Sequence, residues 1–216
     1  GQLESLGNLR NLPTVVEHRM LAGTKVGYIA FNYWMLPMVE RVKAAMTDLR
    51  GKGMEALVLD LRGNPGGVGA MAIPVARLVM REPGSLGRLQ FRAFVQEFNV
   101  AGDPEAFAGP VVILVDEGTA STSEIFAAGL RDLGRVKIAG ARPSAGAALP
   151  SLLETLDDGA LLQYVVGDYH SAKGTVAEGD GVAPDIVAAE TRADFVAGRD
   201  PVLAAAVAAL TAKPGP

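Results

Sequence analysis

Two apolar runs stand out in the hydrophobic pattern of the chain, at Ala56–Leu61, where Asp60 is the one polar residue, and at Val111–Val115. Short apolar runs without alternation are typical of strands that are buried on both faces of a parallel sheet. Apolar residues at helical spacing precede the first run at Met38–Leu49, and helices are also expected over about residues 70–80 and 121–133. Strands that alternate with helices predict an α/β fold with right-handed crossovers.

Two hairpins are expected outside this alternation. The first joins Val15–Leu21 to Val26–Phe31 through a glycine-containing turn. The second joins Leu152–Leu156 to Ala160–Val166 through Asp157-Asp158-Gly159, and an Asp-Gly turn is the strongest short-range hairpin signal. A further short strand is expected at residues 136–139.

The pattern predicts one domain with a flanking segment at each end. Residues 1–13 are polar, contain Gly7 and Pro13, and are expected to be a linker tail. Residues 14–190 form the α/β core. Residues 191–216 form a C-terminal helical segment, in which Pro201–Leu210 is an Ala-rich helix.

Composition narrows the classes of function. The 216 residues are 49% hydrophobic and 20% charged, with a formal net charge of −4. These values exclude a disordered chain and a general attraction to nucleic acid or anionic membrane. The chain has no cysteine, and His18 and His170 are not spaced as metal ligands, so no metal or cofactor is expected. The longest apolar run, Val202–Leu210, is shorter than the roughly 20 residues that span a membrane.

The first candidate for chemistry is the glycine-rich loop Arg62–Gly67, which follows the buried strand at Ala56–Leu61. Ligands of open α/β sheets bind at the carboxyl ends of strands. Glycines there let backbone N–H groups face a ligand, and such groups can form part of an oxyanion hole. The same glycines also suit an ordinary strand-to-helix turn with positive φ, so the loop alone does not distinguish the two.

The second candidate is the segment Gly118–Ile125, where a serine stands at the start of a predicted helix. The free N–H groups and the dipole of a helix N-terminus favour negative charge beside Ser121. Ser121 with Glu124 also fits a capping box, which requires no chemistry, and the segment is not a G-x-S-x-G elbow. If the two loops are neighbours, however, a nucleophile lies beside backbone donors, as acyl transfer requires.

A serine nucleophile needs a general base. The downstream candidates are Lys137, Lys173, His170 and Glu178. Each residue also has a structural explanation, because lysines in strands or turns are usually solvated and a lone histidine or loop glutamate is often a surface residue.

Three motifs resemble those of the C-terminal processing, or tail-specific, serine peptidases. They are Leu57–Gly67, the nucleophile segment Gly118–Ile125 and the closing motif Glu178–Ile186, in the family's order. The resemblance covers about residues 14 to 190. It implies a Clp-protease/crotonase-like α/β fold of stacked ββα units.

The resemblance also implies roles for individual residues. Ser121 matches the nucleophile, and the N–H groups of Thr122 and of Gly66 or Gly67 match the oxyanion hole. Asp132 matches a supporting acidic position of the family. Glu178 matches the glutamate of a tricorn-like branch that uses serine with histidine and glutamate.

The chain departs from the family at the base. Ala147 stands where many members carry the lysine of a Ser-Lys dyad, so that dyad is excluded. The tricorn-like branch has its histidine ahead of the core, and no matching region is found here. The peptide-binding PDZ module is also not found. We therefore expect a core whose catalytic machinery is incomplete without an upstream region; His170 stays a candidate within the chain.

The leading hypothesis is a serine endopeptidase that acts on unfolded protein C-termini through an acyl-enzyme, in a periplasmic or extracellular location and with homo-oligomers as an option. One alternative is a non-catalytic domain of the same fold that binds peptides or apolar ligands, as in relatives resembling the retinoid-binding protein of the eye. A crotonase-type acyl-thioester enzyme is disfavoured, because the serine motif would have no role in it.

Overall fold

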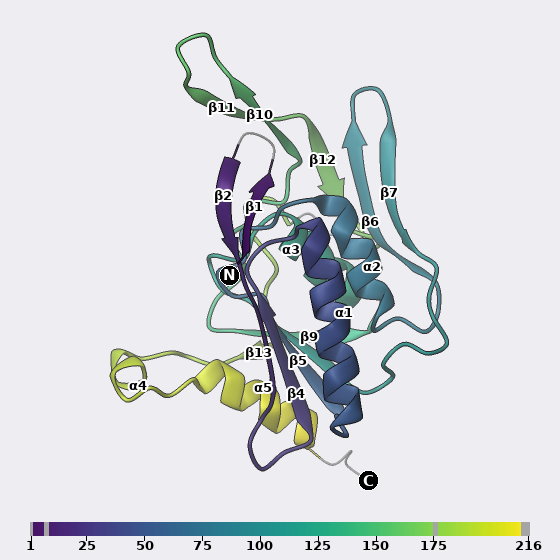
Figure 1. Cartoon of the computed structure of the whole chain (residues 1–216), viewed down its shortest axis with the longest axis vertical. Helices are drawn as coiled ribbons and strands as arrows, with labels where there is room; N and C mark the ends of the chain where they lie inside the picture. The colour runs from purple at the N-terminus through teal and green to yellow at the C-terminus, as the bar shows by residue number, and fades with distance from the viewer. Residues whose placement is uncertain (1, 7–8, 175–176, 213–216) are drawn as a thin grey trace.

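A six-stranded sheet forms the centre of the computed structural model, which describes residues 2–6, 9–174 and 177–212 (Figure 1). Its order is β13-β9-β8-β5-β4-β3, and every neighbouring pair is parallel except β3 with β4. The parallel strands and the β3–β4 hairpin confirm the predicted α/β core. The strands are β3 (Val16–Met20), β4 (Val26–Phe31), β5 (Ala56–Asp60), β8 (Val111–Leu114), β9 (Val136–Gly140) and β13 (Ile186–Val187).

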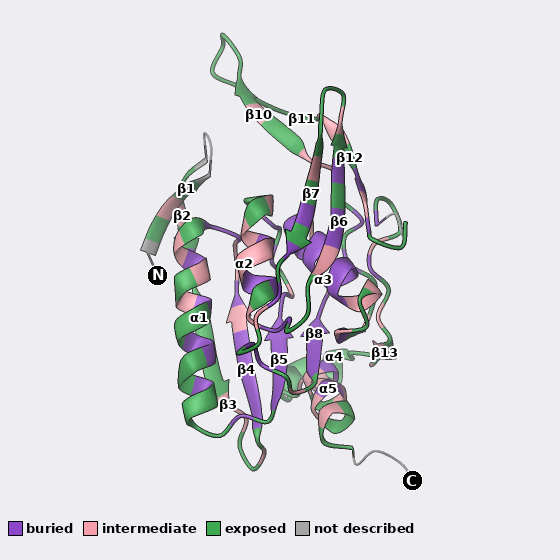
Figure 2. Cartoon of the chain, turned by 90° about the vertical axis from the view of Figure 1, so that its right-hand side faces the viewer, coloured by how far each residue is buried: buried purple, intermediate pink, exposed green. Residues whose placement is uncertain are grey.

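Helices cover both faces of this sheet. Alternate residues of the central strands belong to two separate apolar clusters: Leu57 and Ile113 pack with α1, α2 and α3, whereas Val58 and Val112 pack with α5. All residues of β5 are buried, which explains the apolar residues Ala56–Leu59, and the buried Asp60 at its end is paired with Tyr28 and Arg62 (Figure 2). The helices are α1 (Leu36–Gly51), α2 (Ala72–Arg77), α3 (Thr122–Asp132), α4 (Arg192–Val196) and α5 (Pro201–Thr211).

The predicted helix over residues 70–80 is shorter than expected. A 3-10 turn at Gly69–Met71 leads into α2, which ends at Arg77. The chain then enters an antiparallel sheet of order β12-β6-β7, which the hydrophobic pattern does not predict. Its strands are β6 (Gly84–Phe91), β7 (Val95–Val100) and β12 (Gly167–His170).

Two further hairpins extend from the same end of the molecule (Figure 1). The predicted hairpin around Asp157–Gly159 is confirmed as β10 (Ser151–Thr155) and β11 (Leu161–Val165). The second, β1 (Gln2–Leu6) with β2 (Leu9–Thr14), lies where the polar sequence predicts a linker tail. Leu12 of β2 packs against the main core, so backbone pairing and one apolar anchor order this segment.

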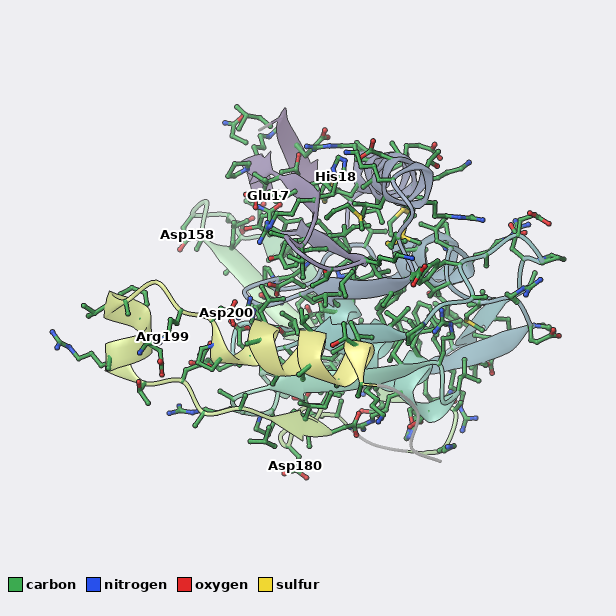
Figure 3. All side chains as sticks on the ribbon, turned by 90° about the horizontal axis from the view of Figure 1, so that it is seen from below. Glu17, His18, Asp158, Asp180, Arg199 and Asp200 are labelled. Carbon is green, nitrogen blue, oxygen red and sulfur yellow. The ribbon has the colours of Figure 1, made fainter. Side chains whose placement is uncertain are left out.

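The C-terminal segment carries α4 and α5, and α5 lies along the sheet when it is seen from below (Figure 3). Val202 and Ala206 of α5 are buried against the second face. Among the described residues, no helix is long and apolar enough to cross a membrane.

Candidate active site

Ser121 lies between β8 and α3, at the carboxyl end of the central sheet. Its φ of 54° falls in the left-handed region, which is uncommon for a residue other than glycine. This backbone differs from the extended conformation of a normal N-cap, although Ser121 and Glu124 are placed as in the predicted capping box. Capping requires no positive φ, so the capping box alone does not explain the conformation of this serine.

Glu124 holds the Ser121 backbone in this conformation. The Ser121 N–H donates to Ala147 O at 2.9 Å and to Glu124 Oε2 at 3.0 Å. The Glu124 carboxylate is fully buried and also accepts from Ser144 Oγ at 2.6 Å, Gly146 N at 2.8 Å and Ala147 N at 2.9 Å. Four donors thus satisfy a buried charge and join the serine to the 144–147 loop.

The glycine loop after β5 lies directly against the serine. A Cβ built on Gly66 would be 2.7 Å from Ser121 Cβ and 3.1 Å from its Oγ. The peptide N–H of Ala120 donates to Asn64 O at 3.0 Å. The two loops are therefore neighbours, as the sequence predicts for parallel adjacent strands.

The two predicted glycine donors differ in their partners. Gly66 N–H donates to Asn64 Oδ1 at 3.0 Å, so it is already used within the loop. No described residue accepts a hydrogen bond from the N–H of Gly67 or from that of Thr122, the first residue of α3. Within the described part of the chain, Gly67 and Thr122 therefore differ from Gly66 in having N–H groups without an acceptor.

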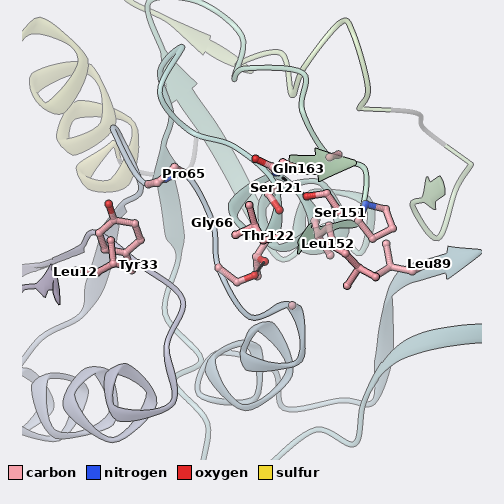
Figure 4. Close-up of a pocket in the computed structure, with 16 residues that line it drawn as sticks. Leu12, Tyr33, Pro65, Gly66, Leu89, Ser121, Thr122, Ser151, Leu152 and Gln163 are labelled. Atoms are coloured by element: carbon pink, nitrogen blue, oxygen red, sulfur yellow. Dashed lines mark hydrogen bonds between the residues drawn. The ribbon is translucent and has the colours of Figure 1, made fainter. Parts of the chain in front are cut away.

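A cavity of about 640 Å³ opens at Ser121 (Figure 4). Its lining includes both glycines, Thr122 and the first half of β10, and none of its lining residues carries a charge. Apolar side chains come from several elements: Leu12, Leu89, Ile125, Leu152 and Leu153. Such a surface suits an apolar group next to the serine.

Glu178 is the one predicted acid that the structure brings to this region. It lines a smaller adjoining cavity of about 280 Å³ together with Ser121 and Ala147. Its Oε2 accepts from Ala148 N at 2.9 Å. Ala147 thus lies beside the serine, where the resemblance would place a lysine, and its methyl group supplies no base.

His170 and Asp132 do not reach the serine. His170 is the last residue of β12, pairs with Arg88 of β6 and lines neither cavity that contains Ser121. Asp132 ends α3, and at 1.5 Å per residue it lies roughly 16 Å from the helix start. Its Oδ2 accepts from Lys173 N at 3.2 Å, so its contact is with that turn.

The other basic candidates are also remote from the site. Lys137 is an exposed residue of β9, and Lys173 is exposed in a turn. His18 of β3 contacts Asp48 of α1 at 3.0 Å. Among the residues that line the two Ser121 cavities, none is histidine or lysine.

Sequence reasoning missed the residues that shape the site. Glu124 was visible only as part of a capping box, and Asn64 only as part of a turn. Trp34 is buried, and its Nε1 donates to Ser123 Oγ at 2.8 Å, which in turn donates to Asn64 O at 3.1 Å. Buried tryptophan and asparagine near a glycine loop are a weak signal, because each residue type occurs in many cores.

Comparisons with known proteins show the family to which the chain belongs. The sequence profile described as peptidase family S41 matches residues 25–188, about three quarters of the chain. A carboxyl-terminal-processing protease of Picosynechococcus sp. is 33% identical over 76% of this chain and 39% of its own length. One of Synechocystis sp. is 32% identical over 80% of this chain and 40% of its own. The chain therefore spans about two fifths of these relatives.

Solved structures support the same assignment. A photosystem II D1 C-terminal processing protease superposes with a TM-score of 0.68 at 27% identity, over 84% of this chain and 50% of that one. The tricorn protease shares the fold, with a TM-score of 0.67 at 19% identity over 86% of this chain and 17% of that one. The predicted resemblance is confirmed at the family level: this chain belongs to peptidase family S41.

Proposed function

We propose that this chain is the catalytic core of a serine peptidase in which Ser121 is the nucleophile. The observation that carries the proposal is a serine with strained backbone that lines a cavity together with Gly67 and Thr122, whose N–H groups donate to no described residue. This combination places a nucleophile next to donors for developing negative charge.

The reaction would proceed in two steps. Ser121 Oγ attacks the scissile carbonyl while a base takes its proton, and the carbonyl oxygen becomes an oxyanion that accepts from Gly67 and Thr122 N–H. Collapse breaks the C–N bond, the base gives its proton to the leaving amine, and an acyl-enzyme remains. Water then attacks the acyl carbon as the base takes a water proton and returns it to Ser121 Oγ, which releases the new carboxylic acid product.

The residues that line the two cavities include no histidine or lysine to act as the general base for Ser121. Glu178 lies in the adjoining cavity, where its carboxylate could orient a histidine rather than replace one. We propose a histidine from outside residues 1–216, as the tricorn-like resemblance implies. His170 would reach Ser121 only if β12 left its pairing with β6.

The substrate is proposed to be an extended peptide with an apolar side chain near the scissile bond. The uncharged lining of the 640 Å³ cavity supports this choice. The relatives' name, carboxyl-terminal-processing protease, suggests a protein C-terminus as the natural substrate. A periplasmic or extracellular location and assembly into homo-oligomers stay predictions.

Labelling by a fluorophosphonate probe, followed by intact-mass analysis, tests the nucleophile. We would compare this chain with a version extended by any native sequence upstream of Gly1. Ser121→Ala should abolish labelling, whereas Ser151→Ala should retain it, because Ser151 lines the same cavities but its Oγ accepts from Gln163 at 2.7 Å. Labelling of the extended form alone would place the base upstream; labelling of both would place it in this chain.

A second candidate function is binding without catalysis. The absence of histidine and lysine from the lining of the two cavities, within the described residues, favours it. If neither form labels while both are folded, this alternative replaces the peptidase proposal, and retention of an apolar peptide by both forms would support it.

A further inference from the structure

We propose that Asn64 is a positioning residue that makes Gly67, rather than Gly66, the oxyanion donor of the glycine loop. This inference rests on the proposed function, since it concerns how the same site is built.

The Asn64 side chain occupies the N–H group of Gly66. Its side-chain Oδ1 accepts the Gly66 N–H at 3.0 Å, which closes a tight turn within the loop. Gly66 has a φ of 98°, a conformation that side-chain-bearing residues rarely adopt. The Gly66 N–H therefore faces back into the loop instead of into the cavity.

Trp34 sets the direction of the next peptide groups. Its N–H donates to Gly66 O at 2.9 Å, and its carbonyl accepts from Val68 N at 2.7 Å. In a parallel bridge of this kind, the residue between the two bonded ones turns its N–H and C=O to the opposite side. Gly67 O indeed accepts from Thr122 Oγ1 at 3.1 Å, on the side of the nucleophile helix.

Hydrogen bonds to Phe31, Ala120 and Ser123 fix the position of Asn64. Its side chain is fully buried, and Nδ2 donates to Phe31 O at the end of β4 at 2.8 Å. Its backbone carbonyl accepts from Ala120 N and Ser123 Oγ of the nucleophile segment. One amide side chain thereby ties the glycine loop to β4, and its backbone ties the loop to Ser121, so the donor is oriented before substrate arrives.

Two substitutions separate the roles of the amide. Asn64→Ala removes both side-chain bonds. Asn64→Asp keeps an acceptor for Gly66 N–H, but at neutral pH its second oxygen faces Phe31 O without a proton to donate. Protonation of that carboxyl restores the donor, and burial beside a carbonyl raises its pKa. The groups that Asn64 contacts by hydrogen bonds are all uncharged.

The first measurement is the rate constant of Ser121 phosphonylation, in whichever form of the protein labels. Removal of one oxyanion donor typically costs about 10² to 10³ in rate, so a misplaced donor in Asn64→Ala should cost at least about 10-fold. The rate of Asn64→Asp relative to wild type, measured at each pH, should rise as the pH falls. Tyr169→Phe, which loses a buried hydrogen bond to Leu86 O, controls for destabilisation alone.

The second measurement does not depend on catalysis. The Gly66 amide proton should exchange with solvent at least about 10-fold faster in Asn64→Ala, while amides of β5 remain unchanged. Fluorescence of Trp34, the single tryptophan, reports whether each variant is folded.

The outcomes are distinct. A folded Asn64→Ala protein that labels at the wild-type rate, or unchanged Gly66 exchange, overturns the inference. If Asn64→Ala does not fold, Asn64→Asp decides, and a pH-independent rate ratio overturns it. If wild type never labels, the proposed function has failed, and Gly66 exchange still tests what Asn64 does to the loop.

Discussion

Arg62 and Asp200 form a pair of hydrogen bonds, Nη1 to Oδ1 at 3.1 Å and Nη2 to Oδ2 at 2.7 Å, between residues 138 positions apart. Arg62 opens the glycine loop, and Asp200 caps α5 by accepting from Leu203 N at 2.8 Å. Arg62 also donates to Asp60, whose carboxylate accepts from the buried Tyr28 hydroxyl. The last helix is thereby tied to the strand that carries the active-site loop.

This pair predicts a pH dependence of stability. Burial opposes ionisation of Asp200, but hydrogen bonds from Arg62 and from the backbone outweigh it and hold the pKa of Asp200 below its usual range. Its contribution is therefore present above about pH 4, the usual range for the unfolded carboxyl, and is lost as the pH falls through the lower folded value.

Asp200→Asn should therefore lower the free energy of unfolding at pH 7 by about 1 kcal/mol, a value reduced for partial exposure. Urea unfolding of both proteins at pH 7 and pH 3 measures the difference. The gap should shrink at the lower pH; a constant gap would show that ionisation of Asp200 is not its source.

The close approach of Gly66 to Ser121 predicts a steric effect. Gly66→Ala would place a methyl group 2.7 Å from Ser121 Cβ, so phosphonylation should slow by about 100-fold or more. Gly63→Ala is the matched control: it also has positive φ, but its Cβ meets nothing within 4 Å, and only about 1 kcal/mol of strain is expected. Equal labelling of the two variants would contradict the steric argument.

The buried Glu124 carboxylate predicts graded destabilisation. Glu124→Ala leaves buried N–H groups without an acceptor, each at about 1–3 kcal/mol, so about 3 kcal/mol or more in total is expected. Glu124→Gln keeps one acceptor oxygen and should lose about half as much. Urea unfolding followed by Trp34 fluorescence measures both; a Gln variant as unstable as the Ala variant would mean that shape matters more than the acceptors.

Ala147 predicts a gain of reactivity. Because it lines the same cavity as Ser121, Ala147→Lys should place an amine there that serves as a general base once it is deprotonated. Labelling of this chain at pH 8 to 9 should rise at least about 10-fold over wild type. Ala147→Met, similar in length but without the amine, should give no gain.

The sequence predicts those parts of the fold that carry a local pattern. β5 and β8 are evident from their apolar runs, and β10–β11 from its Asp-Gly turn. The β1–β2 hairpin is not evident, because its sequence does not alternate between apolar and polar residues. The sheet of β6, β7 and β12 joins segments far apart in the chain, and local periodicity does not report such pairing.

The candidate site likewise contains features that a local pattern predicts and features that depend on contacts between distant residues. Ser121 and the glycine loop follow from their positions at strand ends. The choice between Gly66 and Gly67 depends on contacts with Asn64 and Trp34, which no spacing rule reveals. Asp132 and Ser121 lie at opposite ends of α3, so their shared helix does not bring the two side chains together.

The position of α5 bears on where the folding unit ends. The family profile matches as far as residue 188, but Val202 and Ala206 of α5 cover a face that includes Val58 and Val112. A chain cut at that boundary would expose a continuous apolar sheet surface, the kind that promotes aggregation. The core therefore extends beyond the residues that the family profile matches, since α5 lies along the sheet face that it covers (Figure 3).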